Sequence, residues 1–182
     1  MFILTEQTPN PATLKFLPGV AVMPSGTANF TSKEATSRSP LAERLFGLPE
    51  VSGVFFSGDF ITVTKTDNSD WSQMKPAVLT AIMEHFTTGQ PIITGTAIEP
   101  AANEGEDDGV VSAIKELLET RVRPTVAQDG GDIIFADFAD GIVYLHMQGS
   151  CSGCPSSTAT LKNGIENMLR HYIPEVREVR AV

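Results

Sequence analysis

Two cysteines, Cys151 and Cys154, are the residues of this chain whose type and spacing are best suited to chemistry, and the sequence contains no others. They lie in the segment GSCSGCP, which ends at Pro155, and proline is typical of the first residue of a helix. The peptide dipoles at a helix start favour the thiolate form, which ligates metals and attacks disulfides. The glycines of the segment predict a bent loop that exposes both sulfur atoms, and its serines, Ser150 and Ser152, are expected to donate hydrogen bonds to sulfur.

The number of possible ligands decides which chemistry fits. A zinc or iron–sulfur site usually takes four ligands, and one copy of this chain supplies two cysteines. His171 follows Cys154 by 17 residues, roughly 25 Å along a helix, which is too far to help. We interpret His146 as an ordinary strand residue rather than a ligand, and His85 as structural or solvated. Two copies of the chain, related by a twofold axis near the loop, would complete a site of four thiolates.

The elements around the cysteines form an expected α-β-β-α-β module, with a small mixed sheet covered by two helices. Its first helix, capped by Asp107 or Asp108, should stop or kink at Pro124. The apolar face expected for that helix is Val110, Val111, Ile114, Leu117, Leu118 and Val122. A turn at 129–132 leads into strands at 133–138 and 142–147, which Asp140-Gly141 joins as a hairpin.

The helix that follows the cysteines is expected to end at Pro174, and residues 176–182 are expected to add an edge strand. Its predicted buried face consists of Leu161, Ile165, Met168, Leu169 and Tyr172.

The N-terminal half predicts a second small α/β domain with about four strands and two helices. The expected strands are 2–4, 13–17, 51–56 and 60–64. Ser39 is a typical N-cap for a short helix at 40–46 that begins with Pro40. Asp70 and Gln73 resemble a capping box, but Pro76 would then lie inside the helix, so the second helix is placed at 76–86.

An acidic segment at 99–109, EPAANEGEDDG, separates the two halves. It contains five acidic residues and no basic residue, and it cannot bury enough apolar surface to offset its ordering entropy. We therefore predict an N-terminal domain at 1–98, a flexible linker at 99–109 and a C-terminal domain with the cysteine pair at 110–182. The fold class is α/β (α+β), with two small domains.

Composition excludes several classes of protein. The formal net charge is -9 and Lys and Arg form no cluster in the sequence, which argues against nucleic acid as a partner. No apolar run approaches the roughly 20 residues of a membrane span, so no membrane partner is expected. The start, MFILTEQTPNP, lacks the pattern of a signal peptide, which favours a cytoplasmic (bacterial) protein or the mature form of an organellar one.

Several segments together resemble a known family. They are Arg123-Pro124-Thr125, Asp129-Gly130-Gly131-Asp132, Gly149 to Ser157 and Thr160 to Glu166. These are similar to the C-terminal domain of NifU-like (Nfu-type) iron–sulfur cluster scaffold proteins. Gln7 to Pro11, Leu14 to Phe16, Pro18-Gly19 and Ser39 to Ala42 resemble the N-terminal domain of that family's two-domain members.

The resemblance implies a carrier rather than an enzyme. A [4Fe-4S] cluster would lie between two protomers, held by Cys151 and Cys154 of each, although four thiolates also suit [2Fe-2S]. An upstream assembly scaffold would be the donor and apo iron–sulfur proteins the recipients. No catalytic acid, base or nucleophile is expected, because a carrier accelerates no covalent step.

Two other functions use the same cysteines. A CxxC at a helix start also fits a thioredoxin-like dithiol–disulfide oxidoreductase, although the predicted hairpin before the cysteines differs from the βαβ order of that fold. A zinc ion shared across a dimer is the third interpretation, and its colourless site would distinguish it from a brown cluster.

Overall fold

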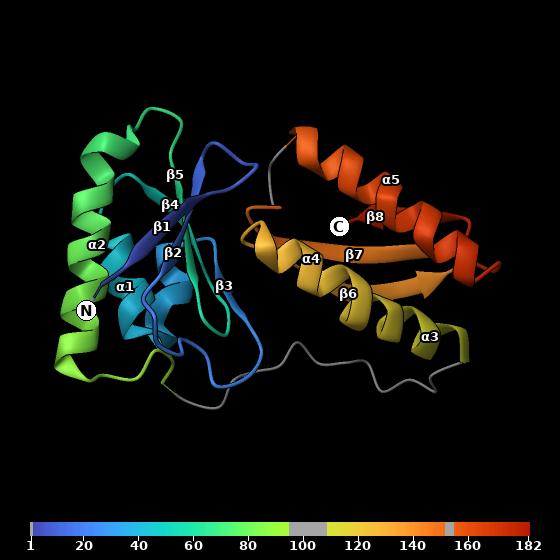
Figure 1. The fold of residues 1–182 in the computed structure, drawn as a ribbon, viewed down its shortest axis with the longest axis horizontal. Helices are drawn as coiled ribbons and strands as arrows, with labels where there is room; N and C mark the ends of the chain where they lie inside the picture. Colours follow the sequence, from blue (N-terminus) through green and yellow to red (C-terminus); the bar gives the residue numbers. More distant parts are fainter. Residues whose placement is uncertain (1, 95–108, 152–154) are drawn as a thin grey trace. The chain divides into compact units, whose positions relative to one another are not determined.

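The computed structural model describes residues 2–94, 109–151 and 155–182, and the chain divides into two compact units, Met1–Pro100 and Ala101–Val182 (Figure 1). We call them the N-terminal and C-terminal domains. Both are small α/β domains, as the sequence predicts. The expected linker at 99–109 lies outside the described residues except for Gly109. The expected caps Asp107 and Asp108 both lie outside them.

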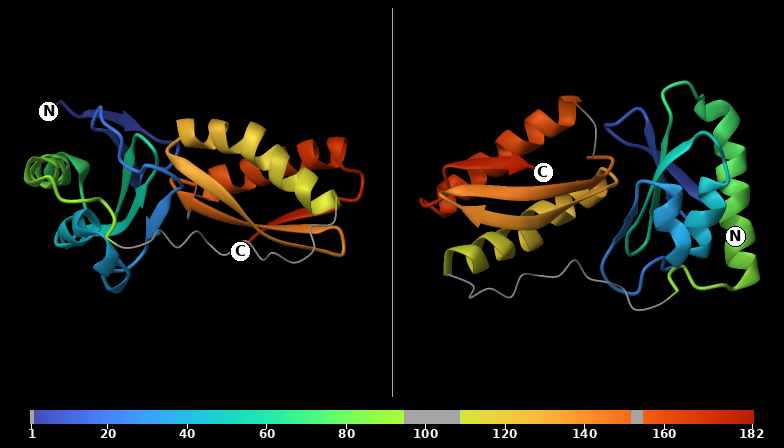
Figure 2. Two further views of the ribbon diagram at one scale, coloured as in Figure 1. Left: turned by 90° about the horizontal axis from the view of Figure 1, so that it is seen from below. Right: turned by 180° about the vertical axis from the view of Figure 1, so that it is seen from behind.

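The N-terminal domain is built on a five-stranded antiparallel sheet in the order β1-β2-β5-β4-β3. The strands are β1 (Leu4–Gln7), β2 (Thr13–Leu17), β3 (Ala28–Phe30), β4 (Val51–Phe56) and β5 (Ile61–Lys65). The helices α1 (Pro40–Phe46) and α2 (Trp71–Thr88) lie on the same face of this sheet, as both views in Figure 2 show. The strand β3, which pairs with β4, was not predicted, and a 3-10 helix occupies Lys33–Arg38.

The start of α1 follows the sequence pattern closely. The Ser39 side chain accepts a hydrogen bond from the backbone N–H of Ala42 at 3.1 Å, and Pro40 is the first helical residue. The Ser39 hydroxyl also donates to the carbonyl of Ile92 at 2.6 Å. One buried side chain therefore caps the helix and holds the segment that leaves the domain.

The helix α2 is longer than the sequence predicts, because it begins at Trp71 and contains Pro76. Asp70 caps it by accepting from the N–H of Ser72 at 2.9 Å. Trp71 packs 6.3 Å from the Phe16 ring and donates to the carbonyl of Pro11. This cap and these tertiary contacts offset the backbone hydrogen bond that a proline removes, which a local pattern does not reveal.

The C-terminal domain has a three-stranded sheet in the order β6-β7-β8, in which β6 and β7 are antiparallel and β7 and β8 parallel. The strands are β6 (Gly131–Ala139), β7 (Ile142–Gly149) and β8 (Glu178–Ala181). Asp140 and Gly141 form the hairpin turn with φ values of 54° and 78°, as their residue types predict. The mixed sheet with two covering helical segments confirms the expected α-β-β-α-β order.

The first helical segment does not stop at Pro124. It runs through α3 (Gly109–Leu117), a π-helical turn (Leu118–Val122) and α4 (Arg123–Gln128). In the π turn the N–H of Arg123 bonds the carbonyl of Leu118, five residues back. The wider turn accommodates the proline that follows, which would clash with a carbonyl in regular α-helix. The buried residues of the segment are Ile114, Leu118, Val122 and Val126.

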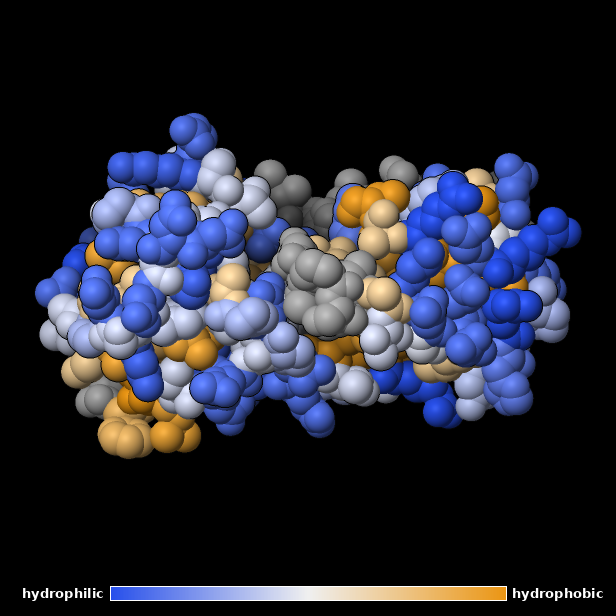
Figure 3. Space-filling view, turned by 90° about the horizontal axis from the view of Figure 1, so that it is seen from above, coloured by the Kyte–Doolittle hydropathy of each residue, from blue (hydrophilic) through white to orange (hydrophobic). Residues whose placement is uncertain are grey.

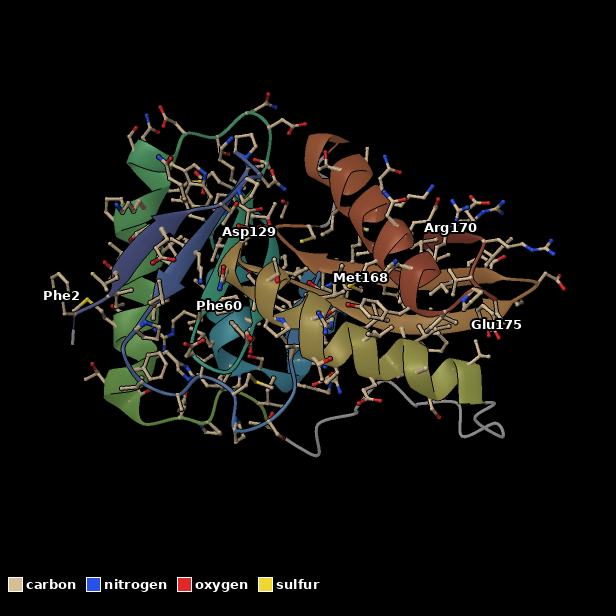
Figure 4. All side chains as sticks on the ribbon, turned by 45° about the vertical axis from the view of Figure 1, so that its right-hand side comes forward. Phe2, Phe60, Asp129, Met168, Arg170 and Glu175 are labelled. Carbon is tan, nitrogen blue, oxygen red and sulfur yellow. The ribbon has the colours of Figure 1, made fainter. Side chains whose placement is uncertain are left out.

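The second helix, α5 (Pro155–Tyr172), starts at the predicted proline. It buries Ile165 and Leu169, Met168 packs against the same core, and Arg170 points away (Figure 4). Tyr172 was expected in this core but is 50% exposed, with the Arg121 guanidinium 5.1 Å from its ring. Ile173, just past the helix end, is buried instead.

The surface is mainly hydrophilic on the face that Figure 3 shows. Among the described residues, no helix combines the length and the apolar character that crossing a membrane requires.

Candidate metal centre

The loop that carries the cysteines leaves the sheet at the point where β6 begins and β7 ends. Gly131 pairs with Gly149, and Asp132 pairs with Gln148. Gly149 has a φ of 64°, in the left-handed region that favours glycine, which confirms the expected bend. Cys151 comes two residues later, whereas Cys154 lies outside the described residues together with Ser152 and Gly153.

Cys151 is buried, which contradicts the expectation that its sulfur is exposed. Its residue exposure is 5%, and it belongs to the apolar core of the C-terminal domain. The space for the sulfur is next to Gly131, because a Cβ built at that glycine would lie 2.4 Å from the Cys151 Sγ. The sequence pattern identified this glycine as part of a turn and gave no sign of the contact.

Ser150 bonds the neighbouring turn instead of the sulfur. Its hydroxyl donates to the carbonyl of Asp129 at 2.5 Å, and its N–H bonds the carbonyl of Gly130 at 3.2 Å. Figure 4 labels Asp129 in this turn, and Gly130 has a φ of 79°. Two hydrogen bonds therefore tie the start of the cysteine loop to the turn before β6, which corrects the predicted role of Ser150.

A buried ion pair fixes the same turn from the helical side. Asp132 is 4% exposed and accepts from the Nε and Nη2 of Arg123 at 2.9 and 3.0 Å, and from the N–H of Ile133 at 2.8 Å. Glu119 contacts the remaining arm of the guanidinium, one helical turn earlier. The hydrogen bonds that the Arg123 guanidinium donates to Asp132 raise the pKa of Arg123 above its usual range, so Arg123 stays charged.

Sequence reasoning missed the role of this pair. Arg123 and Asp132 are nine residues apart in different elements, so no periodic pattern links them. The one available signal was that both residues lie in segments that carry the family resemblance. Their geometry joins α4 to the start of β6, where Asp132 pairs with Gln148 near the end of β7.

The histidines lie apart from any ligand cluster. The Nδ1 of the exposed His146 is 3.1 Å from the carbonyl oxygen of Val182, which agrees with an ordinary strand residue. His171 is exposed and contacts the Tyr172 ring, and His85 is buried in the N-terminal domain. Within the described part of the chain, no group of three or more His, Cys, Asp or Glu side chains is placed to hold a metal ion.

Comparison with known proteins gives two family matches. Residues 3–89 match the scaffold protein Nfu/NifU N-terminal family, and residues 114–180 match the NifU-like domain. The chain is also 53% identical to a human protein, the NFU1 iron-sulfur cluster scaffold homolog, mitochondrial, across 100% of this chain and 72% of that protein. The chain belongs to the Nfu family of iron–sulfur cluster scaffold proteins. The expected family membership is thereby confirmed for both halves of the sequence.

Other Nfu relatives are longer than this chain. The NFU1 homologue of Drosophila virilis is 53% identical, and the chain spans 62% of its length, while the homologue of Drosophila persimilis is 52% identical and is spanned to 65%. Among solved structures, a NifU-like protein from Saccharomyces cerevisiae is 24% identical over 53% of this chain and 87% of that one, with a TM-score of 0.48.

Proposed function

We propose that this Nfu protein carries a [4Fe-4S] cluster between two copies of the chain and passes it to apo iron–sulfur proteins. Cys151 and Cys154 of each copy would be the four ligands. An upstream assembly scaffold would supply the cluster. The proposal also places the domain boundaries at the acidic segment, with 99–109 as a linker between 1–98 and 110–182.

The number of cysteines carries this proposal. The whole sequence has two, both in the loop between β7 and α5, so a four-thiolate cluster requires a second chain. The helix start at Pro155 supplies partial positive charge to a thiolate-bound cluster. Membership of a scaffold family supports an iron–sulfur cluster over zinc as the cargo.

Carriage at the seam between two chains suits release as well as binding. Separating or exchanging the subunits frees a cluster without unfolding either domain. Such transfer needs thiolates and a partner, and it needs no general acid or base. The same geometry gives no support to the oxidoreductase alternative, because the antiparallel β6–β7 hairpin leads directly into the cysteine loop.

The experiment is anaerobic reconstitution followed by iron, sulfide and mass measurement on one sample. We expect a brown dimer with about four irons and four sulfides per two chains. Cys151→Ser and Cys154→Ser should each abolish the colour while leaving the fold intact by circular dichroism. Half that content, about two irons and two sulfides per two chains, would show that the cluster is [2Fe-2S]. A colourless zinc-bound dimer, a monomer that keeps an intact cluster, or efficient disulfide reduction by the cluster-free protein would overturn the proposal.

The compartment is part of the proposal too. The human and Drosophila relatives are named as mitochondrial, which supports the organellar alternative over the bacterial cytoplasm. Fractionation of the source cells, with detection of the native protein by antibody, distinguishes the two locations.

A further inference from the structure

The burial of Cys151 depends on one neighbour, Gly131. A Cβ on Gly131 would lie 2.4 Å from the sulfur of Cys151, 3.2 Å from its Cβ and 3.1 Å from the carbonyl oxygen of Gln148. Real Cβ atoms do not approach other atoms at 2.4 Å, so any larger residue at 131 would force the sulfur or the strand to shift. The hydrogen that replaces a side chain at Gly131 thus creates the space that the thiol occupies.

Backbone conformation does not explain this glycine. The glycines of the described C-terminal domain with positive φ are Gly130, Gly141 and Gly149, and Gly131 is not among them. Gly131 begins β6 in register with Gly149, outside the left-handed region that favours glycine. A substitution to alanine at 131 therefore tests mainly the steric contact with Cys151, which is closer than the contact with the Gln148 carbonyl oxygen.

We infer that Gly131 controls the access of Cys151 to the cluster, because it forms a socket that holds the Cys151 thiol inside the core of the cluster-free domain. This inference rests on the proposed function only in taking Cys151 as a cluster ligand. Because Cys151 as a residue is 5% exposed, a cluster shared with a second chain requires its sulfur to become accessible, so we expect the sulfur to leave the socket when the cluster arrives.

The residues before Cys151 are fixed by hydrogen bonds and an ion pair. Ser150 is held by its two hydrogen bonds to Asp129 and Gly130, and the turn itself is held by the Arg123–Asp132 ion pair. These contacts hold Ser150 and the turn before β6 in place, so we expect the outward movement to begin at Cys151. One of the two ligands is thus sheltered from solvent until it is used.

The first test measures alkylation of the cluster-free, reduced protein by iodoacetamide, with each cysteine followed separately by mass spectrometry. In the native wild type, Cys151 should react about tenfold more slowly than in urea, or slower, because reaction requires opening of the socket. Gly131→Ala should remove most of this protection. The matched control is Gly164→Ala in α5, where a new Cβ meets nothing within 4 Å and Cys151 should stay protected.

The second test remains informative if Gly131→Ala folds poorly. Thermal unfolding is measured for Gly131→Ala, Cys151→Ala and the double variant. Because the closest clash is with the sulfur, the Tm loss caused by Gly131→Ala should shrink by about half or more when Cys151 is already alanine. A purely structural role for Gly131 would give the same Tm loss in both backgrounds.

The readouts separate this inference from the proposed function. Native wild-type Cys151 that reacts as fast as in urea, or additive Tm losses, would overturn the socket even if the cluster binds. Protection of Cys151 together with coupled Tm losses supports the socket even if reconstitution fails. If the socket and the proposed cluster binding are both correct, Gly131→Ala should take up cluster faster than the wild type, because the Cys151 thiol of this variant is already exposed.

Discussion

The two domains share one architecture, a sheet with helices packed against it, but they place their buried polar groups differently. In the N-terminal domain such residues are scattered, among them Asn10, Ser39 and His85, and the core includes the aromatic residues Phe16, Phe30 and Phe56. In the described part of the C-terminal domain, the buried polar or charged residues are Asp132 and Ser150, and the fully buried part of its core contains no aromatic residue.

This contrast is centred on the cysteine loop. Asp132 and Ser150 both flank the cysteine loop, so the C-terminal domain concentrates its departures from an apolar core at one end of the sheet. A buried charge is costly unless it is paired, and Arg123 supplies the partner. The N-terminal domain contains no cysteine, and its buried Ser39 holds the start of α1 and the segment at Ile92 in place.

The largest expected effect comes from Phe56→Ala, which would test whether the two cores are independent. Phe56 is fully buried in β4, with its ring centroid 5.5 Å from that of Phe30, and the cavity should cost about 3–5 kcal/mol of N-terminal domain stability. Tryptophan fluorescence reports this domain, because Trp71 is the single tryptophan. Cluster stoichiometry should not change.

Leu145→Ala is the mirror experiment in the C-terminal domain. Leu145 is fully buried in β7, so its loss should lower the second unfolding transition, followed by circular dichroism, and leave the Trp71 signal in place. If either variant shifted both transitions equally, the comparison of separate cores would be wrong.

A smaller effect is expected for Asp132→Ala, which removes the buried charge at the cysteine end. Arg123 keeps 31% side-chain exposure, so water softens the loss to about 2 kcal/mol of C-terminal domain stability. Cluster retention should fall as well, because the turn that supports Cys151 loses its anchor. Urea unfolding by circular dichroism and the decay of visible absorption measure the two effects.

The control is Glu119→Ala, which removes the other carboxylate on Arg123. Glu119 is 67% exposed on its side chain, and its loss should cost less than about 0.5 kcal/mol. Equal losses for the two variants would show that burial does not distinguish them.

The smallest expected effect is a pH dependence confined to the N-terminal domain. Burial of His85, with a further contribution from the Arg44 charge, lowers its pKa below the ordinary 6.5, while the Gln90 backbone opposes this shift. The unfolded chain then binds the proton more readily. Stability is therefore complete above pH 6.5 and falls as the pH drops from there toward the lowered pKa, by at most about 1.4 kcal/mol per pH unit.

His85→Leu should flatten this dependence in the Trp71 unfolding curve. Glu84 pairs with Arg44 at 2.8 Å and should stay unchanged in this variant, so that the Arg44 charge near residue 85 keeps its partner. A slope that survives in His85→Leu would assign the titration to another group.

Local signals in the sequence predicted what local forces decide. The Ser39 cap, the Asp140-Gly141 turn and the start of α5 at Pro155 all depend on residues within a few positions of one another, and the structure confirms them. Pairing across the fold was missed. The Arg123–Asp132 ion pair and the contact of Cys151 with Gly131 join residues of different elements, so their geometry appears only once the sheet has formed.

The two internal prolines show the same limit. Pro76 was expected to begin a helix and Pro124 to end or kink one, since each removes a backbone donor. The helix α2 continues past Pro76 because Trp71 packs against the domain core. The segment 109–128 continues past Pro124 because a π-helical turn precedes that proline.

The π-helical turn at Leu118–Val122 couples the length of its helical segment to the proline that follows. Its wider loop adds a residue between Leu118 and Val122 that the proline at 124 requires. Deleting one residue there would rotate everything before it by about 100° relative to Arg123 and return a carbonyl to the path of the proline ring. The length of the segment and Pro124 are therefore coupled, and replacing Pro124 would let a helix that is one residue shorter form at the same place.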